Sequence, residues 1–313
     1  VGPMPGRQAM PEVKATDSVY LMSYFKASAQ HLFYAYSRDG KTWTDINGSR
    51  PVFNAYDDEV WLRDPYLHRV THNGKTKFHL IHTWGWDHPA LFHWESDDLI
   101  HWTAANGGTR TDDGKIMLMD GHDGGPVSPN AWAPEFTYDG QTGTFYLYWS
   151  SRIGDRQVHH YCTTKDWLTF STPAVYFDPG FTAIDMTILK EGDTYYAYYK
   201  DERNGEKTIR CATSKSLDPR VQRFEGSTPL LPSRYIEVEG PEVFPAMGGK
   251  GWFLYFDKFN GDRGVSYTGC TDPSQHKWYP IPDDEIRNPT EVKHGSVEII
   301  STAELEKLLE HFK

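Results

Sequence analysis

The chain has 313 residues, of which 32 are Lys or Arg and 43 are Asp or Glu, so its formal net charge is −11 at pH 7. This acidic balance disfavours nucleic acid as a partner, because phosphate binding depends on clustered Lys and Arg. Aromatic residues make up 15% of the chain, which predicts a well-filled core with aromatic side chains left over for a binding surface.

The apolar pattern and the first residues bear on location. No stretch approaches the roughly 18 consecutive apolar residues of a membrane span, and we expect a soluble chain with no membrane partner. Residues 1–4 lack the basic segment and apolar core of a signal peptide. Secretion, or a periplasmic location with the leader removed, therefore stays open.

Cysteine usage is sparse. Cys162, Cys211 and Cys270 lie far apart and in no metal-ligand spacing. We interpret them as partly buried thiols that behave as small apolar residues. The sequence therefore predicts no disulfide framework.

A short aromatic strand that ends in a polar turn and a Trp recurs after an N-terminal extension (1–18). The segment 34–43, Tyr-Ala-Tyr-Ser-Arg-Asp-Gly-Lys-Thr-Trp, is similar to 92–102, and a weaker copy is 161–170. The period of roughly 50 to 60 residues is in the range of propeller blades.

Alternating strands separated by Gly, Asn and Asp lie around these turns. The expected strands include 19–25, 32–37, 77–83, 144–149, 194–199 and 251–256. A terminal helix is expected over 302–313, where Leu305, Leu308 and Leu309 share one face.

Four strands per unit and five units account for the length. The sequence thus predicts an all-β fold in one domain (1–313), a five-bladed β-propeller with four-stranded antiparallel blades around a central funnel. Four blades are expected to open at 63–65, 132–135, 184–186 and 239–241. Residues 293–300 would supply the fifth innermost strand and pair with the N-terminal strands, which removes an exposed sheet edge.

Three carboxylates, Asp64, Asp185 and Glu239, stand inside similar short strands. We expect each to hold the same place in its blade, at the start of the innermost strand, so that the three converge at the axis. Burial of neighbouring carboxylates raises their pKa values through desolvation and like charge, and acid/base catalysis uses such shifts. One carboxylic acid can protonate the leaving oxygen of a glycosidic bond while a second carboxylate activates water or attacks the sugar. The three acids together predict glycoside cleavage.

The chain resembles glycoside hydrolase family 43 from about residue 20 to residue 300. The resemblance rests on Arg63-Asp64-Pro65, Trp132-Ala133-Pro134-Glu135, Ala183-Ile184-Asp185, Glu239-Gly240-Pro241 and His294-Gly295-Ser296, in this order. It implies a five-bladed propeller that cleaves α-L-arabinofuranosides, β-D-xylosides and galactosides with inversion. It also implies that Asp64 is the general base, Asp185 the residue that tunes and orients the acid, and Glu239 the general acid.

Two positions depart from the family pattern. Glu135 stands where the family usually has Asp, and Met186 stands where it usually has Pro. Neither departure removes a catalytic carboxylate, but both weaken the transfer of a substrate from better-known members.

Aromatic, basic and polar residues near strand ends are expected to line the pocket. The face of Trp86 is the preferred stacking platform for a sugar ring, and basic residues can bond sugar hydroxyls and support the ionised base. The expected substrate-binding residues are Trp86, Trp132, Glu135, Trp149, Arg152, Lys200 and His294.

Metal ligation is weakly indicated. His294 matches the family's axial histidine, which lies near a central water or calcium ion, so a structural Ca²⁺ near His294 stays open although no cofactor is expected to be required. We interpret His79, His82, His159 and His160 as ordinary histidines, because the sequence offers no third ligand at metal spacing.

The expected function is that of an exo-acting, inverting glycosidase, first an α-L-arabinofuranosidase, then a β-D-xylosidase or a β-D-galactofuranosidase. Its expected partner is an oligosaccharide or polysaccharide of plant or microbial origin, and we expect a monomer. Inversion predicts a separation of roughly 6.5 to 9.5 Å between the Asp64 and Glu239 carboxyl groups.

Two other classes stay open. A propeller that binds glycans without cleaving them would keep Trp86 and Trp132 but need not keep all three acids. A retaining fructan-type hydrolase would need an Asn-Asp-Pro-Asn stretch near the N-terminus, which residues 54–58 do not supply.

Overall fold

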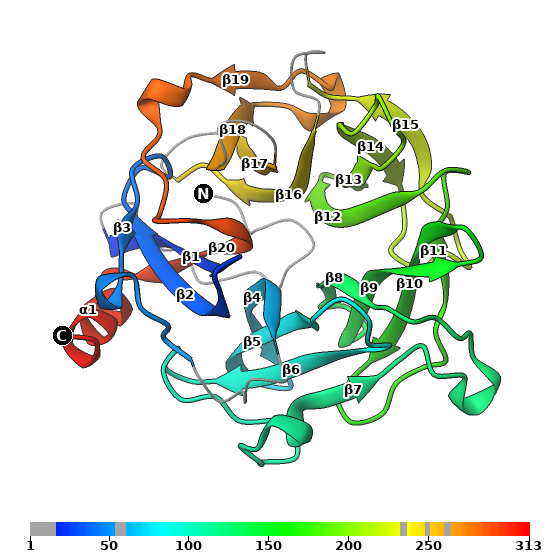
Figure 1. The fold of residues 1–313 in the computed structure, drawn as a ribbon, viewed down its shortest axis with the longest axis horizontal. Coiled ribbons are helices and arrows are strands. Elements are labelled where there is room, and N and C mark those ends of the chain that lie inside the picture. Colours follow the sequence, from blue (N-terminus) through cyan, green and yellow to red (C-terminus); the bar gives the residue numbers. More distant parts are fainter. Residues whose placement is uncertain (1–16, 54–60, 232–236, 248–250, 260–263) are drawn as a thin grey trace.

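Five four-stranded sheets surround a central axis in the described part of the chain. The computed structural model describes residues 17–53, 61–231, 237–247, 251–259 and 264–313, so most of the N-terminal extension and the segment 54–58 lie outside the described residues. Figure 1 looks down the axis, with the innermost strands β4, β8, β12, β16 and β20 nearest the centre. The prediction of a five-bladed β-propeller with antiparallel blades is confirmed.

Each blade is named here by its innermost strand. The β4 blade comprises β4 (Leu62–His72), β5 (Lys75–Trp84), β6 (Ala90–Ser96) and β7 (Lys115–Met117). The β8 blade comprises β8 (Trp132–Asp139), β9 (Thr144–Ile153), β10 (Arg156–Thr164) and β11 (Ala174–Phe177). The β12 blade comprises β12 (Ala183–Glu191), β13 (Thr194–Asp201), β14 (Ile209–Ser214) and β15 (Glu225–Pro229). The β16 blade comprises β16 (Val238–Pro245), β17 (Trp252–Lys258), β18 (Gly264–Cys270) and β19 (Tyr279–Ile281).

The last blade joins both ends of the chain. The β20 blade comprises β20 (Lys293–Ser301), β1 (Ser18–Lys26), β2 (Ala29–Ser37) and β3 (Thr44–Asp45). β1 pairs antiparallel with β20 on one side and with β2 on the other. The predicted ring closure is therefore confirmed, and the paired terminal strands leave no free inner edge in this blade.

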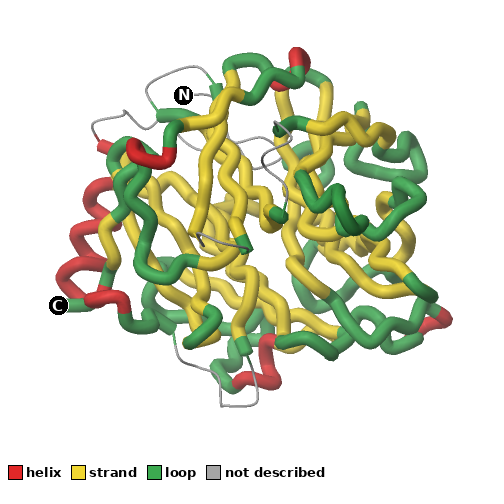
Figure 2. Tube along the Cα trace, turned by 45° about the horizontal axis from the view of Figure 1, so that its top comes forward, coloured by secondary structure: helices red, strands yellow, loops and turns green. Residues whose placement is uncertain are grey.

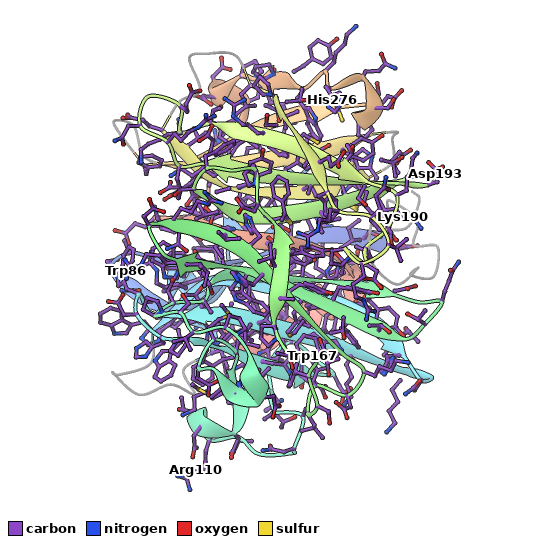
Figure 3. The ribbon with its side chains drawn as sticks, turned by 90° about the vertical axis from the view of Figure 1, so that its right-hand side faces the viewer. Trp86, Arg110, Trp167, Lys190, Asp193 and His276 are labelled. Carbon is purple, nitrogen blue, oxygen red and sulfur yellow. The ribbon has the colours of Figure 1, made fainter. Side chains whose placement is uncertain are left out.

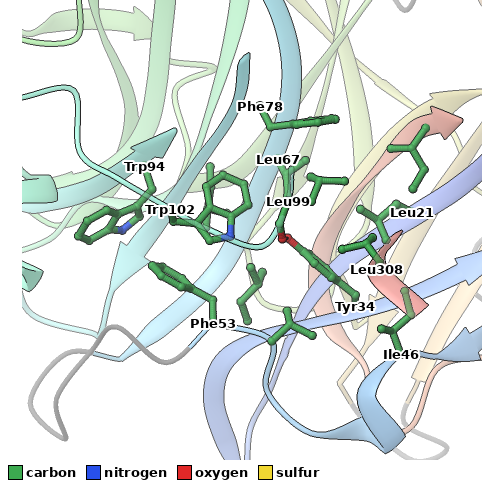
Figure 4. Close-up of a cluster of buried hydrophobic side chains, with 14 of the residues drawn as sticks. Leu21, Tyr34, Ile46, Phe53, Leu67, Phe78, Trp94, Leu99, Trp102 and Leu308 are labelled. Carbon is green, nitrogen blue, oxygen red and sulfur yellow. The ribbon is translucent and has the colours of Figure 1, made fainter. Parts of the chain in front are cut away.

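A single α-helix among the described residues, α1 (Thr302–His311), follows β20 directly. Ser301 and Glu304 form a capping box at its start, which satisfies backbone N–H groups that the helix leaves open. Leu305 and Leu308 are buried against the β20 and β4 blades, in a cluster that Figure 4 shows with Leu308 beside Tyr34. Figure 2 shows the helix on the outside of a body built from strands. No helix in the described ranges is long and apolar enough to cross a membrane.

The repeated turns found in the sequence adopt one hydrogen-bonded structure. In the first copy Ser37 Oγ accepts from Gly40 N at 2.9 Å, and Asp39 Oδ1 accepts from the two following amides. Ser96 and Asp98 make the same bonds in the second copy, as do Thr164 and Asp166 in the third.

The third turn differs in where its Trp lies. Trp167 occupies the left-handed position that Gly40 and Leu99 hold in the other copies, with φ of 60°. Phe170 takes the place of the usual Trp. The ring of Trp167 consequently packs against the neighbouring β4 blade.

The innermost strands share a β-bulge near their starts. Between Arg63 and Tyr66 of β4 two residues oppose one on β5, and the register shifts at the matching place in β8, β12 and β16. The first bulged residue has positive φ in these four strands, at Asp64 (50°), Ala133 (48°), Asp185 (62°) and Gly240 (60°). Such bulges re-aim side chains near sites at the ends of strands.

This register corrects one expectation. Asp64 and Asp185 do hold the same place, but Glu239 stands one residue earlier, and Gly240 holds the shared place in the β16 blade. A Cβ at residue 240 would lie 2.8 Å from His294 Cγ. A side chain therefore does not fit there, and the carboxylate of this blade comes from the preceding residue.

Candidate active site

A pocket with a volume of about 330 Å³ lies at the starts of the innermost strands. Its wall contains Asp64, Asp185 and Glu239 together, so the three predicted acids converge although they come from three blades. Figure 3 views the molecule from the side, with Trp86 from the pocket wall at one end and Lys190 and Asp193, at the β12–β13 turn, toward the other. The pocket thus opens on the face where β4, β12 and β16 begin.

Asp64 is held ionised by its neighbours. His294 Nδ1 lies 3.3 Å from Asp64 Oδ1, and Thr83 Oγ1 donates to Asp64 Oδ2 at 2.9 Å. Burial raises the pKa of Asp64, but the bond and charge of His294, the charge of Arg63 and the Thr83 bond together lower it below its usual range. Thr83 Oγ1 also accepts from Ala133 N at 2.9 Å, which fixes the hydroxyl.

His294 is the cationic partner in this pair. Burial lowers its pKa, but the hydrogen bond to Asp64 and the charges of Asp64, Asp185 and Asp257 raise it to about 10. The imidazole therefore carries two protons at neutral pH. Its backbone N donates to Asp257 Oδ2 at 2.8 Å, which holds the start of β20 in place.

The pKa of Asp185 is raised, whereas that of Asp64 is lowered. Burial raises the pKa of Asp185, His294 lowers it, and the charges of Glu239 and Asp64 raise it further, to about 7. Asp185 Oδ2 accepts from Gly240 N at 3.0 Å, so this carboxyl is tied to the residue directly after Glu239. The contact gives Asp185 a physical route to orient Glu239.

Glu239 lies between two ammonium groups. Lys200 Nζ donates to Glu239 Oε2 at 3.4 Å, and Lys293 Nζ lies 3.9 Å from Glu239 Oε1. Lys200 also contacts Glu202, and Lys293 lies 3.7 Å from Asp257 Oδ2. These contacts restrict the position of the Glu239 carboxyl at the pocket wall.

The mouth carries aromatic side chains. Trp86 is 52% exposed and Trp132 packs edge-on against it, with ring centroids 6.1 Å apart. Trp132 Nε1 donates to the backbone oxygen of Trp86 at 2.7 Å. The guanidinium of Arg63 lies 4.4 Å from the Trp86 ring centroid and 4.7 Å from that of Phe25. Arg63 thus holds the exposed indole in place from one side.

Three residues expected to bind substrate lie away from the pocket wall. Trp149 is fully buried in the core of the β4 and β8 blades, and its Nε1 donates to Ser151 Oγ. Arg152 has an exposed side chain near the end of β9, outside the pocket lining. Glu135 is buried on the axis beside Glu242 and His294. Trp149 stands opposite the bulge of β8, and Ser150 holds the place on β9 that Lys200 holds on β13.

A group of three buried side chains at the axis could hold a cation: Glu135, Glu242 and His294. Each offers one ligand atom within 4.8 Å of the others. Calcium takes six to eight oxygen ligands, so the two carboxylates fit it in part. An imidazole binds a metal through an unprotonated nitrogen, whereas His294 holds two protons at neutral pH. A cation here would therefore compete with the second proton of His294.

The sequence analysis did not predict several of the residues that line the pocket. The wall also contains Phe25, Arg63, Thr83, Glu202, Lys207, Phe259 and Lys293. Arg63 and Lys293 stand directly before Asp64 and His294, at the place that Glu239 holds in β16, so strand register would have indicated them. Lys207 comes from the connection between β13 and β14, for which the sequence carries no signal.

The arrangement is suited to acid/base chemistry. One carboxyl is kept ionised by an imidazolium, a second keeps a proton up to about neutral pH, and a third lies between two ammonium groups. Three carboxyl groups in environments this different can take separate parts in acid/base catalysis.

Comparison with known proteins agrees with this chemistry. A family model described as a probable glycosyl hydrolase domain, related to glycoside hydrolase family 43, matches residues 17–306. An α-L-arabinofuranosidase from Bifidobacterium longum subsp. longum is 27% identical over 249 residues, covering 64% of this chain and 22% of that protein. The chain thus spans about a fifth of the length of this curated relative.

Solved structures share the fold. A family 43 arabinoxylan arabinofuranohydrolase from Bacillus subtilis, in complex with cellotetraose, matches with a TM-score of 0.62 and 16% identity, over 92% of this chain and 67% of that one. An endo-1,4-β-xylanase from Bacteroides thetaiotaomicron matches with a TM-score of 0.61 and 16% identity, over 95% and 98%.

Proposed function

Since the chain belongs to the family of glycoside hydrolase 43-related domains, we propose that it is an exo-acting, inverting glycosidase that releases a terminal sugar from plant or microbial polysaccharide. The observation that carries the proposal is the convergence of Asp64, Asp185 and Glu239 in one pocket with opposite pKa shifts at the two aspartates.

α-L-Arabinofuranosidase is our first assignment. The curated relative named as an α-L-arabinofuranosidase supports it. A pocket of about 330 Å³ is at the small end of the range for ligand sites, which suits the terminal unit of a glycan better than a long internal stretch. β-D-Xylosidase and β-D-galactofuranosidase are the runners-up.

Asp64 acts as the general base in this proposal. His294 and Thr83 keep its carboxylate ionised and oriented, so it can accept a proton from a water molecule that attacks the anomeric carbon. The imidazolium also stabilises the ionised base electrostatically.

Glu239 acts as the general acid. It gives its proton to the glycosidic oxygen as the bond to the anomeric carbon breaks, and the proton taken up by Asp64 balances the step. Asp185, tied to Gly240 N, positions the strand that carries Glu239. Because Asp185 keeps its proton up to about pH 7, it also limits the negative charge next to the acid.

Hydrolysis of a panel of 4-nitrophenyl glycosides tests the proposal. The panel contains the α-L-arabinofuranoside, β-D-xyloside, β-D-galactofuranoside and β-D-galactopyranoside. We expect turnover of the α-L-arabinofuranoside. On an arabinoside with a poor leaving group, kcat should be roughly 10²- to 10⁴-fold lower in Glu239→Gln, because the variant cannot donate the proton. The loss on the 4-nitrophenyl glycoside should be smaller, because 4-nitrophenolate leaves with little proton donation.

Glu202→Gln is the matched control, since Glu202 lines the same pocket and contacts the same lysine. It should retain most of the activity. Near-native rates of Glu239→Gln on a substrate with a poor leaving group would exclude Glu239 as the acid. If the wild type hydrolyses none of the four glycosides but binds arabinan or xylan oligosaccharides, a glycan-binding propeller would be favoured.

A further inference from the structure

The face of the β4 blade that packs against the β8 blade carries a second group of ligand-type side chains. His79 on β5 pairs directly with Glu95 on β6, and His93 lies two residues before Glu95 on the same strand. Residues two apart on a strand share a face, so all three side chains point the same way. Trp94, between them, points to the opposite face and is buried in another cluster, where Figure 4 shows it beside Trp102. None of the three residues lines the pocket.

The three side chains already approach the geometry of a metal site. His79 Nδ1 and His93 Nε2 share a hydrogen bond of 2.9 Å, and His79 Nδ1 lies 3.9 Å from Glu95 Oε1. One ligand atom from each residue lies within 4.8 Å of the others. A tetrahedral zinc ion with ligands at about 2.0 to 2.2 Å would separate neighbouring ligand atoms by roughly 3.3 to 3.5 Å. The separations of 2.9 Å and 3.9 Å differ from this range by about half an ångström, and the third pair, His93 and Glu95, lies within 4.8 Å.

Both imidazoles are buried, with exposures of 4% for His79 and 2% for His93. A metal binds an imidazole nitrogen through its lone pair, so a bound ion would displace the proton of the hydrogen bond between the two rings. Glu95 is partly exposed, 24% at its side chain, which leaves a route for an ion and a fourth position for water.

Trp167 from the β8 blade fixes the rings. It stacks on His93 with centroids 3.8 Å apart and an angle of 6° between the planes, and it stacks on His79 at 5.6 Å. Figure 3 labels Trp167 well away from Trp86, so the stack is distant from the pocket mouth. A bulky residue with φ of 60° is rare, and this backbone shape is what brings the indole onto the histidines.

We propose that His79, His93 and Glu95 bind one divalent transition-metal ion, zinc in the first place. Two imidazole nitrogens and one carboxylate are a donor set that suits zinc and disfavours calcium and magnesium, which prefer oxygen ligands. The bound ion joins β5 to β6 and, through the stacked Trp167, stiffens the contact between the β4 and β8 blades. The site is independent of the proposed glycosidase activity.

Titration of the chelator-treated protein with ZnCl₂, followed by calorimetry, tests the site, and CoCl₂ gives a second readout through its visible absorption. We expect one ion per chain, with a Co²⁺ spectrum of tetrahedral intensity. Glu95→Gln and His93→Gln should each weaken Zn²⁺ binding by more than the roughly 10- to 100-fold that loss of an outer-shell partner costs. Glu95 is partly exposed, and the amide of a glutamine has the same shape as its carboxylate. Glu95→Gln therefore keeps the test valid if His93→Gln does not fold.

Two controls locate the ion. His122→Gln removes an exposed histidine that pairs with Asp120 on the surface, and it should bind Zn²⁺ as the wild type does. Glu242→Gln alters the axial group and should also leave binding unchanged. Absence of binding by the wild type at 1 mM ZnCl₂, about a thousandfold above a micromolar Kd, would overturn the proposal. So would loss of binding in Glu242→Gln with full binding in Glu95→Gln.

Discussion

Asp64 and Asp185 occupy the same bulge position in two blades, yet their pKa values move in opposite directions. Both are buried, so desolvation acts on both. Asp64 has an imidazolium and a hydroxyl within hydrogen-bond reach, whereas the described polar contact of Asp185 is one backbone N–H. Local partners, and not position in the repeat, thus assign the roles of the two acids.

The raised pKa of Asp185 predicts a cost in stability. Its folded pKa of about 7 exceeds the usual value of 3.8, so the folded state holds a proton that the unfolded chain releases between about pH 4 and pH 7. Stability therefore falls as pH rises through this window. Asp185→Asn cannot ionise and should be more stable than the wild type at pH 8, by about 1 to 4 kcal/mol at about 1.4 kcal/mol per pKa unit.

Urea unfolding at pH 4.5 and pH 8 measures this difference. The gain in the free energy of unfolding of Asp185→Asn should be small or absent at pH 4.5, where Asp185 is protonated in the folded wild type. Asp193→Asn, in the exposed β12–β13 turn, is the control and should show no gain at either pH. An equal change in the free energy of unfolding of Asp185→Asn at both pH values would contradict the raised pKa of Asp185.

At the scale of the element, the β-bulge decides where each side chain at the axis points. The sequence indicated the innermost strands correctly, because apolar alternation and the turn residues define them. It did not indicate the bulge, because one extra residue leaves no mark in the apolar pattern. For this reason Glu239 was placed one residue out of register, and Trp149 and Arg152 were expected at the pocket although β9 carries them elsewhere.

Gly240→Ala tests the element-scale argument. Gly240 has φ of 60°, and an added Cβ would lie 2.8 Å from His294 Cγ. We expect a loss of about 2 to 5 kcal/mol in the free energy of unfolding, since a left-handed alanine costs about 1 to 2 kcal/mol and overpacking adds about 1 to 3 kcal/mol. Activity should fall as well, because the displaced His294 supports Asp64.

Gly192→Ala is the matched control for the clash. Gly192 also has φ of 60° but would have nothing within 4 Å of the added Cβ. It should lose about 1 to 2 kcal/mol from backbone strain alone. Equal losses in the two variants, measured by urea unfolding, would show that contact with His294 does not require glycine at residue 240.

On the scale of the whole molecule, the ring is closed by buried polar contacts between the last and first innermost strands. His68 Nδ1 lies 2.8 Å from Glu298 Oε2, and both side chains are almost fully buried. The same carboxylate accepts from Arg69 N, and Ser296 Oγ accepts from Leu67 N. These bonds join residues more than 200 positions apart, so they form only when the ring closes.

Glu298→Ala is therefore expected to destabilise the whole ring. Removal of one member of a buried pair costs about 3 to 5 kcal/mol, since its partners lose their acceptor. Glu285→Ala, which removes an exposed pair with Lys41, should cost about 0 to 1 kcal/mol. Thermal unfolding of both variants measures the contrast, and similar melting temperatures would show that the Glu298 contacts do not hold the ring closed.

The number of blades and the ring closure could be predicted because the repeats are visible as aromatic strands and polar turns of constant spacing. The convergence of Asp64, Asp185 and Glu239 followed from the repeat. The sequence did not indicate the group of His79, His93 and Glu95. His93 and Glu95 meet His79 across strands, and sequence spacing does not report cross-strand register. Lys207 was missed because it lies in the connection between β13 and β14, outside the repeated pattern. Arg63 was missed because its place in the repeat, which Glu239 holds in β16, is set by the bulge.

The most direct test of the central claim is the stereochemistry of hydrolysis, followed by ¹H NMR on 4-nitrophenyl α-L-arabinofuranoside. Asp64 as base and Glu239 as acid predict that the β-anomer of arabinose appears first and that the α-anomer grows in later by mutarotation. First appearance of the α-anomer would show retention and would contradict the assignment of Asp64 as a base that activates water.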